Sequence, residues 1–261
     1  MIPPKPVTKS GIVLIIAIQS NAILKKVLNL SNVKFLFKMS TMENLNEENS
    51  QLISHITLRK VIGFIGIFLP IVLVLGSFLS GKYQSVQPSI SDYYYTTMGD
   101  LFVGSLCAIS LFLFCYKGYD NRDNITANIA AFLGICIAVF PTSTHLEKKH
   151  IGLIEDEKIS ATIHFSAAIL FFIALAFFSI YLFTLSKGYV SRKKKLRNKV
   201  YKTCGFIILG CIVLMGIYFF SKNMQMQFEK YNPILVLETI ALWAFGISWI
   251  TKAKTILNGD D

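Results

Sequence analysis

Charged residues are scarce in this sequence of 261 residues. Asp, Glu, Lys and Arg make up 16% of the chain, and its mean hydropathy is +0.54. A chain this apolar and this weakly charged is atypical of a soluble domain of the same size. We therefore expect an all-α integral membrane protein.

Acidic residues are the scarcer charged type. The chain has 15 Asp and Glu against 26 Lys and Arg, which gives a net charge of +11. Such a surplus can mark a nucleic-acid-binding protein. Here, however, the basic residues lie at the ends of apolar runs and form no polar groove face. The pattern therefore argues against nucleic acid and predicts membrane lipids as partners, with anionic headgroups as the counter-charge.

The familiar metal and nucleotide motifs are absent from the sequence. The five cysteines lie inside apolar runs without a CxxC spacing, so we expect them to be packing residues. Four histidines are present, but none forms an HxxxH or HExxH pair. No phosphate-binding glycine loop, nucleophile elbow or nucleotide fingerprint occurs. We predict no cofactor, and zinc enters only under the hydrolase alternative given below.

Six apolar runs approach the roughly 20 residues that a helix needs to cross the hydrocarbon core of a bilayer. The sequence therefore predicts a polytopic bundle of six transmembrane helices within residues 57–255, followed by a short tail at 256–261. The third run is the shortest. The six spans are expected at about 61–80, 99–117, 127–142, 161–185, 203–221 and 233–251.

The loop between the fourth and fifth spans predicts the orientation. Residues 187–202 read KGYVSRKKKLRNKVYK, with eight basic residues and no acid. Short loops rich in Lys and Arg remain on the cytoplasmic side. Six spans then place both termini in the cytoplasm, with 20 Lys and Arg inside against six outside. We expect a multi-pass protein of the cell inner membrane.

Residues 1–56 differ in character from the rest of the chain. The apolar run at 11–18 is too short to span a bilayer, and the mixture of Leu, Val, Phe and Lys that follows is typical of an amphipathic segment on the inner membrane surface. Residues 41–51 are polar and predict a linker. The sequence leaves open whether residues 1–38 belong to the native protein, since Met39 or Met42 could be the start.

Ionisable and polar side chains gather where this topology places the outer ends of the spans. Glu238 is flanked by apolar residues on both sides and has no route to water along its own helix. Ionisable groups at such depths face the bundle interior or a watery cavity, where a partner offsets the cost. By depth, the nearest candidate partners are His164 and Asp100. We predict a polar pocket that opens outward. Its candidate ligand-binding residues are Ser91, Asp92, Asp100, His145, His164 and Glu238.

Structural roles also fit several of these residues. Asp100 could cap the start of the second span, and Tyr93, Tyr94 and Tyr95 could form an aromatic belt at the headgroup level. A lone histidine such as His164 is often a packing residue with satisfied hydrogen bonds.

Three functions compete for the predicted pocket. It could bind a lipid or small amphiphile without chemistry, which we favour. Alternatively, histidines and carboxylates could hold Zn²⁺ in a metal-dependent intramembrane lipid hydrolase. A third possibility is a proton-coupled carrier with Glu238 as the titrating group, although the sequence shows no convincing internal repeats.

Residues 57–255 contain a characteristic set of motifs. They are SISDYYYT, DLFVG, FLFCYKGYD, AVFPT, IHFSAAILFF and LETIALWAFGISW. As a set they resemble an uncharacterised group of bacterial multi-span membrane proteins, and this resemblance implies a six-span bundle without an assigned activity.

A more distant similarity links the chain to the superfamily of alkaline ceramidases and progestin-receptor-like membrane hydrolases. That superfamily places Ser, Asp and His around zinc, and the resemblance offers Ser91, Asp92 or Asp100, and His164 for those roles. The paired histidines of its last span are absent here, where Glu238 and Trp243 occur instead.

Overall fold

The computed structural model describes residues 30–80, 86–118, 121–143, 153–186 and 190–253, with side chains from residue 55 onward. In these residues it contains seven α-helices and three short 3₁₀ helices and no β-strand, so the all-α prediction is confirmed. The chain divides into two compact units, residues 1–54 and 55–261.

Only residues 30–54 of the first unit are described, and they are helical. They form the beginning of α3 (Leu30–Leu79), so the stretch predicted as a linker is part of a helix. The apolar run at 11–18 and the choice of start residue lie outside the described residues.

In the described residues, five helices are long and apolar enough to cross a membrane. They are α3 over His55–Leu79, α5 (Asn121–Val139), α6 (Glu157–Ile180, continued by η2 at Leu182–Thr184), α7 (Arg192–Phe220) and α9 (Pro233–Lys252). Together they indicate a multi-pass membrane protein.

Helix α4 (Gly99–Phe114) takes the place of the predicted second span but is shorter. Its 16 residues extend over about 24 Å at 1.5 Å per residue, against roughly 30 Å of hydrocarbon. The 3₁₀ helix η1 (Ser91–Tyr95) precedes it. The predicted count of six spans therefore depends on the one helix that falls short in length.

The basic segment predicted as a loop is largely helical. Ser191 caps α7, because its hydroxyl accepts a hydrogen bond from the Lys194 N–H at 3.1 Å. Lys and Arg are good helix formers, so α7 begins 11 residues before the predicted span. At its other end, α8 (Lys222–Phe228) and η3 (Glu229–Tyr231) lead to α9.

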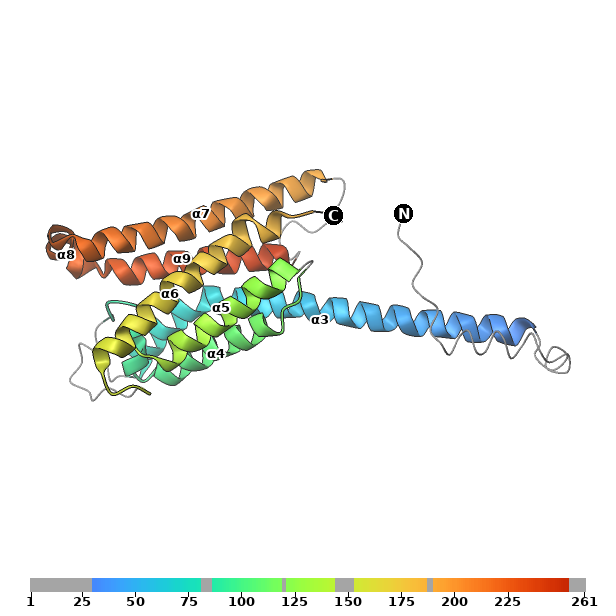
Figure 1. Ribbon diagram of the computed structural model, residues 1–261, viewed down its shortest axis with the longest axis horizontal. Coiled ribbons are helices and arrows are strands. Elements are labelled where there is room, and N and C mark those ends of the chain that lie inside the picture. Colours follow the sequence, from blue (N-terminus) through green and yellow to red (C-terminus); the bar gives the residue numbers. More distant parts are fainter. Residues whose placement is uncertain (1–29, 81–85, 119–120, 144–152, 187–189, 254–261) are drawn as a thin grey trace. The chain divides into compact units, whose positions relative to one another are not determined.

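The second unit is a helical bundle. Helices α4, α5, α6, α7 and α9 pack in this order, each against the next, and α6 also contacts α9. Figure 1 shows α7 and α9 side by side. Helices α3 and α9 cross closely at two glycines, Gly63 and Gly246, where the backbones touch.

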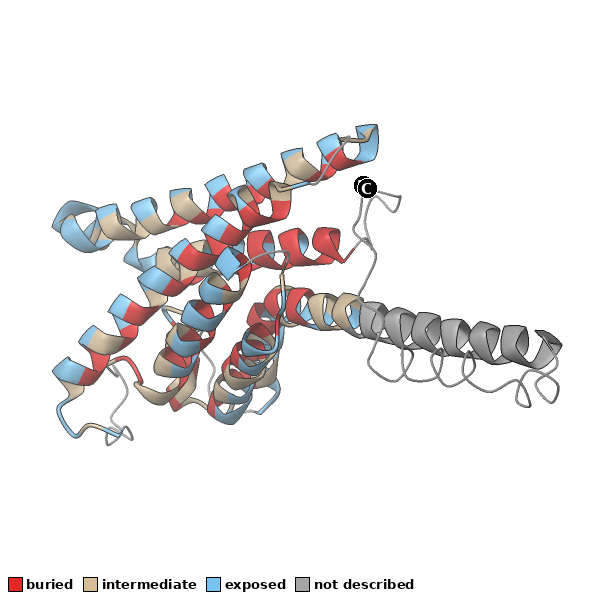
Figure 2. Cartoon of the chain, turned by 45° about the vertical axis from the view of Figure 1, so that its right-hand side comes forward, coloured by how far each residue is buried: buried red, intermediate tan, exposed pale blue. Residues whose placement is uncertain are grey.

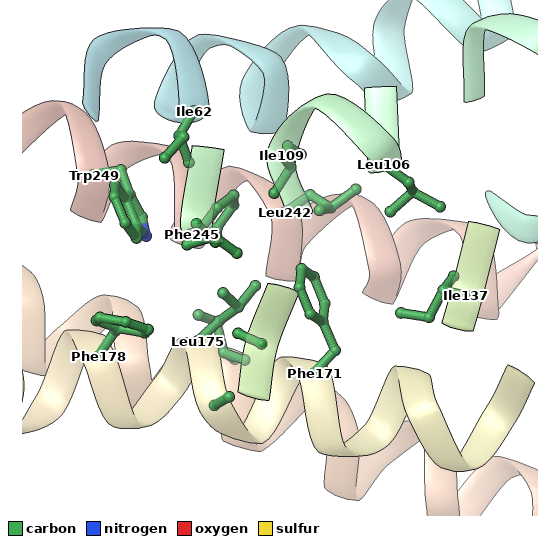
Figure 3. Close-up of a cluster of buried hydrophobic side chains, with 14 of the residues drawn as sticks. Ile62, Leu106, Ile109, Ile137, Phe171, Leu175, Phe178, Leu242, Phe245 and Trp249 are labelled. Carbon is green, nitrogen blue, oxygen red and sulfur yellow. The ribbon is translucent and has the colours of Figure 1, made fainter. Parts of the chain in front are cut away.

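The core between these helices is aromatic and aliphatic. Trp249, Phe245, Phe178 and Phe171 are buried in it together with Ile62 (Figure 3). The outward faces are apolar too: Phe132 and Phe206 are 69% and 62% exposed. Figure 2 shows exposed residues along the outer sides of the helices. Apolar residues on both inner and outer faces are typical of helices surrounded by lipid.

Candidate functional site

The site is built on the end of α5. The last carbonyls of a helix have no partner within that helix, and Pro141 prevents α5 from continuing. Three successive carbonyls directly after α5 accept side-chain hydrogen bonds. The Phe140 carbonyl accepts from His164 Nδ1 at 2.7 Å, Pro141 from Ser160 Oγ at 2.8 Å and Thr142 from Tyr95 OH at 2.7 Å.

His164 connects α6 to η1. Its imidazole is 1% exposed, and its Nε2 lies 2.9 Å from Ser91 Oγ. A carbonyl can only accept a hydrogen bond, so Nδ1 carries the proton that it donates to Phe140. In the neutral ring, Nε2 is then the acceptor for the Ser91 hydroxyl proton. The pair has the arrangement of a hydroxyl beside an oriented base.

Glu238 joins α9 to the segment that precedes η1. Its Oε2 accepts a hydrogen bond from the Ile90 backbone N–H at 2.6 Å. The Leu235 N–H also donates to the Pro88 carbonyl at 3.0 Å. The structure thus gives Glu238 a partner other than His164 or Asp100, the two that the sequence indicated. Backbone amides have no sequence signature, which is why the sequence does not reveal this contact.

A second carboxylate lies near Glu238. Asp92 is close enough for the two negative charges to interact. Its side chain accepts from Ser89 Oγ at 2.8 Å, and its backbone N–H donates to the same Ser89 oxygen at 3.1 Å. This local turn orients Asp92 at the start of η1.

Tyr95 is the hydrogen-bond donor of η1 toward α5. Burial, followed by the negative charges of Glu157 and Asp92, raises its pKa to about 12. The phenol therefore keeps its proton at physiological pH, and its bond to the Thr142 carbonyl is maintained.

The six predicted site residues have three different outcomes. Ser91, Asp92, His164 and Glu238 come together at one end of the bundle, where η1 meets α5, α6 and α9. Asp100 is exposed in the first turn of α4. His145 lies outside the described residues.

No group of three or more His, Cys, Asp or Glu side chains in the described part of the chain is arranged to hold a metal ion. The hydrolase alternative therefore lacks a zinc ligand set among those residues. The proton-coupled carrier remains a prediction.

The chain matches no protein-family model, and neither curated proteins nor solved structures show significant similarity to it. The chemistry of the site itself is therefore the basis on which a function can be assigned to this chain.

Proposed function

We propose that this chain is an inner-membrane protein with six spans and both termini in the cytoplasm, and that its outer end binds a lipid or small amphiphile that carries an amino headgroup. One observation carries the proposal: the Glu238 carboxylate lies within the electrostatic range of a second carboxylate, Asp92, at the end of the bundle. We call this pair with Ser91 and His164 the acidic site.

The chemistry of the acidic site favours a cationic hydrogen-bond donor. Two neighbouring carboxylates repel each other, and a cation between them removes that cost. A carboxylate also accepts hydrogen bonds at both oxygens. Ile90 bonds to Oε2 of Glu238, so an ammonium group could bind at the second oxygen. The apolar exposed faces of the helices would accommodate the acyl chains.

A lipid competition measures this preference. The purified full-length protein is exchanged into mixed micelles with equal amounts of phosphatidylethanolamine and phosphatidylcholine, and bound lipids are counted by native mass spectrometry. Only the phosphatidylethanolamine headgroup has N–H donors. A hydrogen bond to a charged group contributes about 1.5–3 kcal/mol, so we expect a preference for phosphatidylethanolamine of about tenfold or more.

The Glu238→Gln variant removes the negative charge of the site but keeps a hydrogen-bond acceptor at the same position. The glutamine carbonyl can still accept a hydrogen bond from the Ile90 N–H, so the segment before η1 remains bound to α9. The preference for phosphatidylethanolamine over phosphatidylcholine should then fall until the two lipids bind equally. Glu155→Gln removes an exposed acid that precedes α6, and it should keep the preference. Equal retention of the two lipids by the wild type, or an unchanged preference in Glu238→Gln, would refute the proposal.

A lipid hydrolase is the second candidate, and the hydrogen bond between Ser91 and His164 favours it. In such an enzyme Ser91 Oγ would attack an acyl carbonyl while His164 Nε2 takes the hydroxyl proton and passes it to the leaving group, and water would then cleave the acyl-Ser91 ester to release the fatty acid. This route needs no metal. The zinc-dependent variant of the hypothesis is tested by metal analysis, because it requires stoichiometric zinc that is lost in His164→Ala.

A further inference from the structure

Two consecutive residues connect the carboxylate and the imidazole of the acidic site. Ile90 donates its backbone N–H to Glu238 Oε2 at 2.6 Å, and the Oγ atom of the next residue, Ser91, lies 2.9 Å from His164 Nε2. Glu238 belongs to α9 and His164 belongs to α6. Two different helices therefore hold neighbouring residues of one segment.

The bond to Glu238 helps to determine where Ser91 lies. Ile90 directly precedes η1, and Ser91 is the first residue of this 3₁₀ helix. A helix of five residues is not stable by itself, so its position depends on tertiary contacts. The Leu235 N–H of α9 also donates to the Pro88 carbonyl at 3.0 Å. Both contacts with α9 end within three residues of the Ser91 hydroxyl.

A headgroup bound by Glu238 would lie close to the Ser91 hydroxyl. Standard bond lengths limit the distance from the Ile90 nitrogen to Ser91 Oγ to about 7 Å, and the hydrogen bond to Glu238 adds 2.6 Å. Glu238 Oε2 and Ser91 Oγ are therefore within about 10 Å of each other. In a glycerophospholipid, the headgroup nitrogen is separated from the ester carbonyls by the phosphodiester and part of the glycerol, which span a distance of the same order.

Helix lengths indicate that both side chains lie near the depth of the lipid ester groups. The span that contains α6 has 28 residues, or about 42 Å, against about 30 Å of hydrocarbon, so roughly 6 Å at each end extends into the headgroup region. His164 is seven residues after Glu157 and Glu238 is five residues after Pro233, which corresponds to about 10 Å and 8 Å from the helix starts. Both lie a few ångströms below the headgroups.

Ser91 is the accessible member of the pair. Its residue is partly exposed, whereas His164 is buried. His164 Nδ1 donates to the Phe140 carbonyl, so Nε2 is the nitrogen that can take the Ser91 proton. An approachable hydroxyl with an oriented base behind it is the arrangement that covalent catalysis requires.

We propose that the acidic site cleaves the lipid that it binds. Glu238 binds the amino headgroup and, through the Ile90 N–H, positions Ser91 for attack on an acyl ester of the same molecule. The substrate class is a glycerophospholipid with a primary amine in its headgroup. This inference rests on the amino-headgroup proposal and joins to it the hydrolysis that is the second candidate function.

The reaction consumes one water molecule. Ser91 Oγ forms a bond with the acyl carbon while His164 Nε2 takes the hydroxyl proton. The bond between the acyl carbon and the glycerol oxygen breaks, and Nε2 gives the proton to that oxygen, which releases the lysolipid. Water then attacks the acyl-Ser91 ester with Nε2 as the base. This step releases the fatty acid and restores the Ser91 hydroxyl.

The release of lysolipids tests the reaction. The purified full-length protein is incubated in mixed micelles with equal amounts of phosphatidylethanolamine and phosphatidylcholine, and lysolipids are counted by mass spectrometry. We expect lysophosphatidylethanolamine to exceed lysophosphatidylcholine about tenfold or more, because only the amine donates hydrogen bonds to a carboxylate. Ser91→Ala should stop the release. Ser80→Ala removes a hydroxyl that bonds to the Ser77 carbonyl, and it should not.

The outcomes separate this inference from the binding proposal. If the wild type prefers phosphatidylethanolamine in the binding competition but releases no lysolipid, the reaction is overturned and the binding proposal stands. If the competition shows no preference, the binding proposal itself fails. Release that continues in Ser91→Ala, or equal release from both lipids, also overturns the reaction.

Glu238→Gln and Glu238→Leu test the positioning role. Glutamine keeps an acceptor for the Ile90 N–H, whereas leucine has none. Labelling of Ser91 by a fluorophosphonate amphiphile without an amine reports on Ser91 and not on headgroup binding. We expect labelling in Glu238→Leu to be about tenfold or more slower than in Glu238→Gln. Glu155→Leu removes an exposed acid and should be labelled at the wild-type rate.

Ile90→Pro removes the hydrogen-bond donor and keeps Glu238. Ile90 has a φ of −64°, which proline also adopts, so the backbone conformation is compatible with the substitution. This variant replaces Glu238→Leu if that protein does not fold, and its labelling should be slower than that of the wild type by a similar factor. Equal rates in Glu238→Gln and Glu238→Leu, or wild-type labelling in Ile90→Pro, overturn the positioning role.

Discussion

At the scale of single residues, His164 is held by hydrogen bonds on both ring nitrogens. The Phe140 carbonyl orients the ring through Nδ1, and Nε2 lies against Ser91 Oγ. Two such bonds in a buried position serve two purposes. They satisfy a polar side chain that would otherwise destabilise the bundle, and they leave Nε2 where a general base for Ser91 would need to be.

Reaction with a fluorophosphonate amphiphile tests whether Ser91 is activated. General-base catalysis contributes about 100-fold or more, so Ser91 should be labelled in the wild type and labelling should slow by about that factor in His164→Ala. Mass spectrometry of the modified peptide locates the label. Ser80→Ala removes a hydroxyl that bonds to the Ser77 carbonyl and serves as the control. If Ser91 is not labelled, or is labelled equally fast in His164→Ala, the hydrogen bond between Ser91 and His164 has a structural role only.

At the scale of elements, close backbone contact holds α3 against α9. A Cβ atom added at Gly246 would lie 2.6 Å from the Gly63 carbonyl oxygen and 2.6 Å from Ile67 Cγ1. Small residues allow such approach in membrane helices, where dispersion forces and not the hydrophobic effect drive association. Gly104 of α4, by contrast, has no heavy atom within 4 Å of an added Cβ.

Gly246→Ala should destabilise the bundle by about 1–3 kcal/mol, because the new methyl group meets backbone that cannot move away. Unfolding in a denaturing detergent measures the change. Gly210→Ala is the matched control, since nothing lies within 4 Å of an added Cβ there. It should be neutral or stabilising by up to about 1 kcal/mol, as expected for alanine in a helix. Equal losses in the two variants would show that α3 and α9 do not pack at this crossing.

At the scale of the whole molecule, the orientation and the number of spans can be read from three exposed positions. Thr97, Lys117 and Lys195 are each exposed, and each becomes the single cysteine of a cysteine-free variant. In intact cells made permeable at the outer membrane, an impermeant maleimide should label Thr97→Cys. It should label Lys117→Cys and Lys195→Cys only after the inner membrane is disrupted.

The labelling of Lys117→Cys shows whether α4 crosses the membrane, because Lys117 lies three residues after the end of this short helix. If Lys117→Cys is labelled from the same side as Thr97→Cys, α4 does not cross and the count is five spans. If Lys195→Cys is labelled from outside and Thr97→Cys is not, the orientation is inverted. The acidic site would then face the cytoplasm.

The sequence by itself determined the fold class and most helix positions. Apolar runs long enough to span a bilayer are local properties of the chain, so α6 and α9 lie within a few residues of the predicted spans 161–185 and 233–251. The depth of Glu238 within its helix is also local, and it identified the end of the bundle where four of the six candidate residues meet.

Only the tertiary structure decided what these residues touch. The Glu238 partner is a backbone N–H 148 residues away, and such an amide looks the same at every position of a sequence. The buried cations show the same limit. Lys194 and Arg197 belong to a segment that predicts a cytoplasmic loop, yet α7 buries them beside Lys252 and Arg59. Burial depends on which helices pack together, and hydrophobicity along the chain does not contain that information.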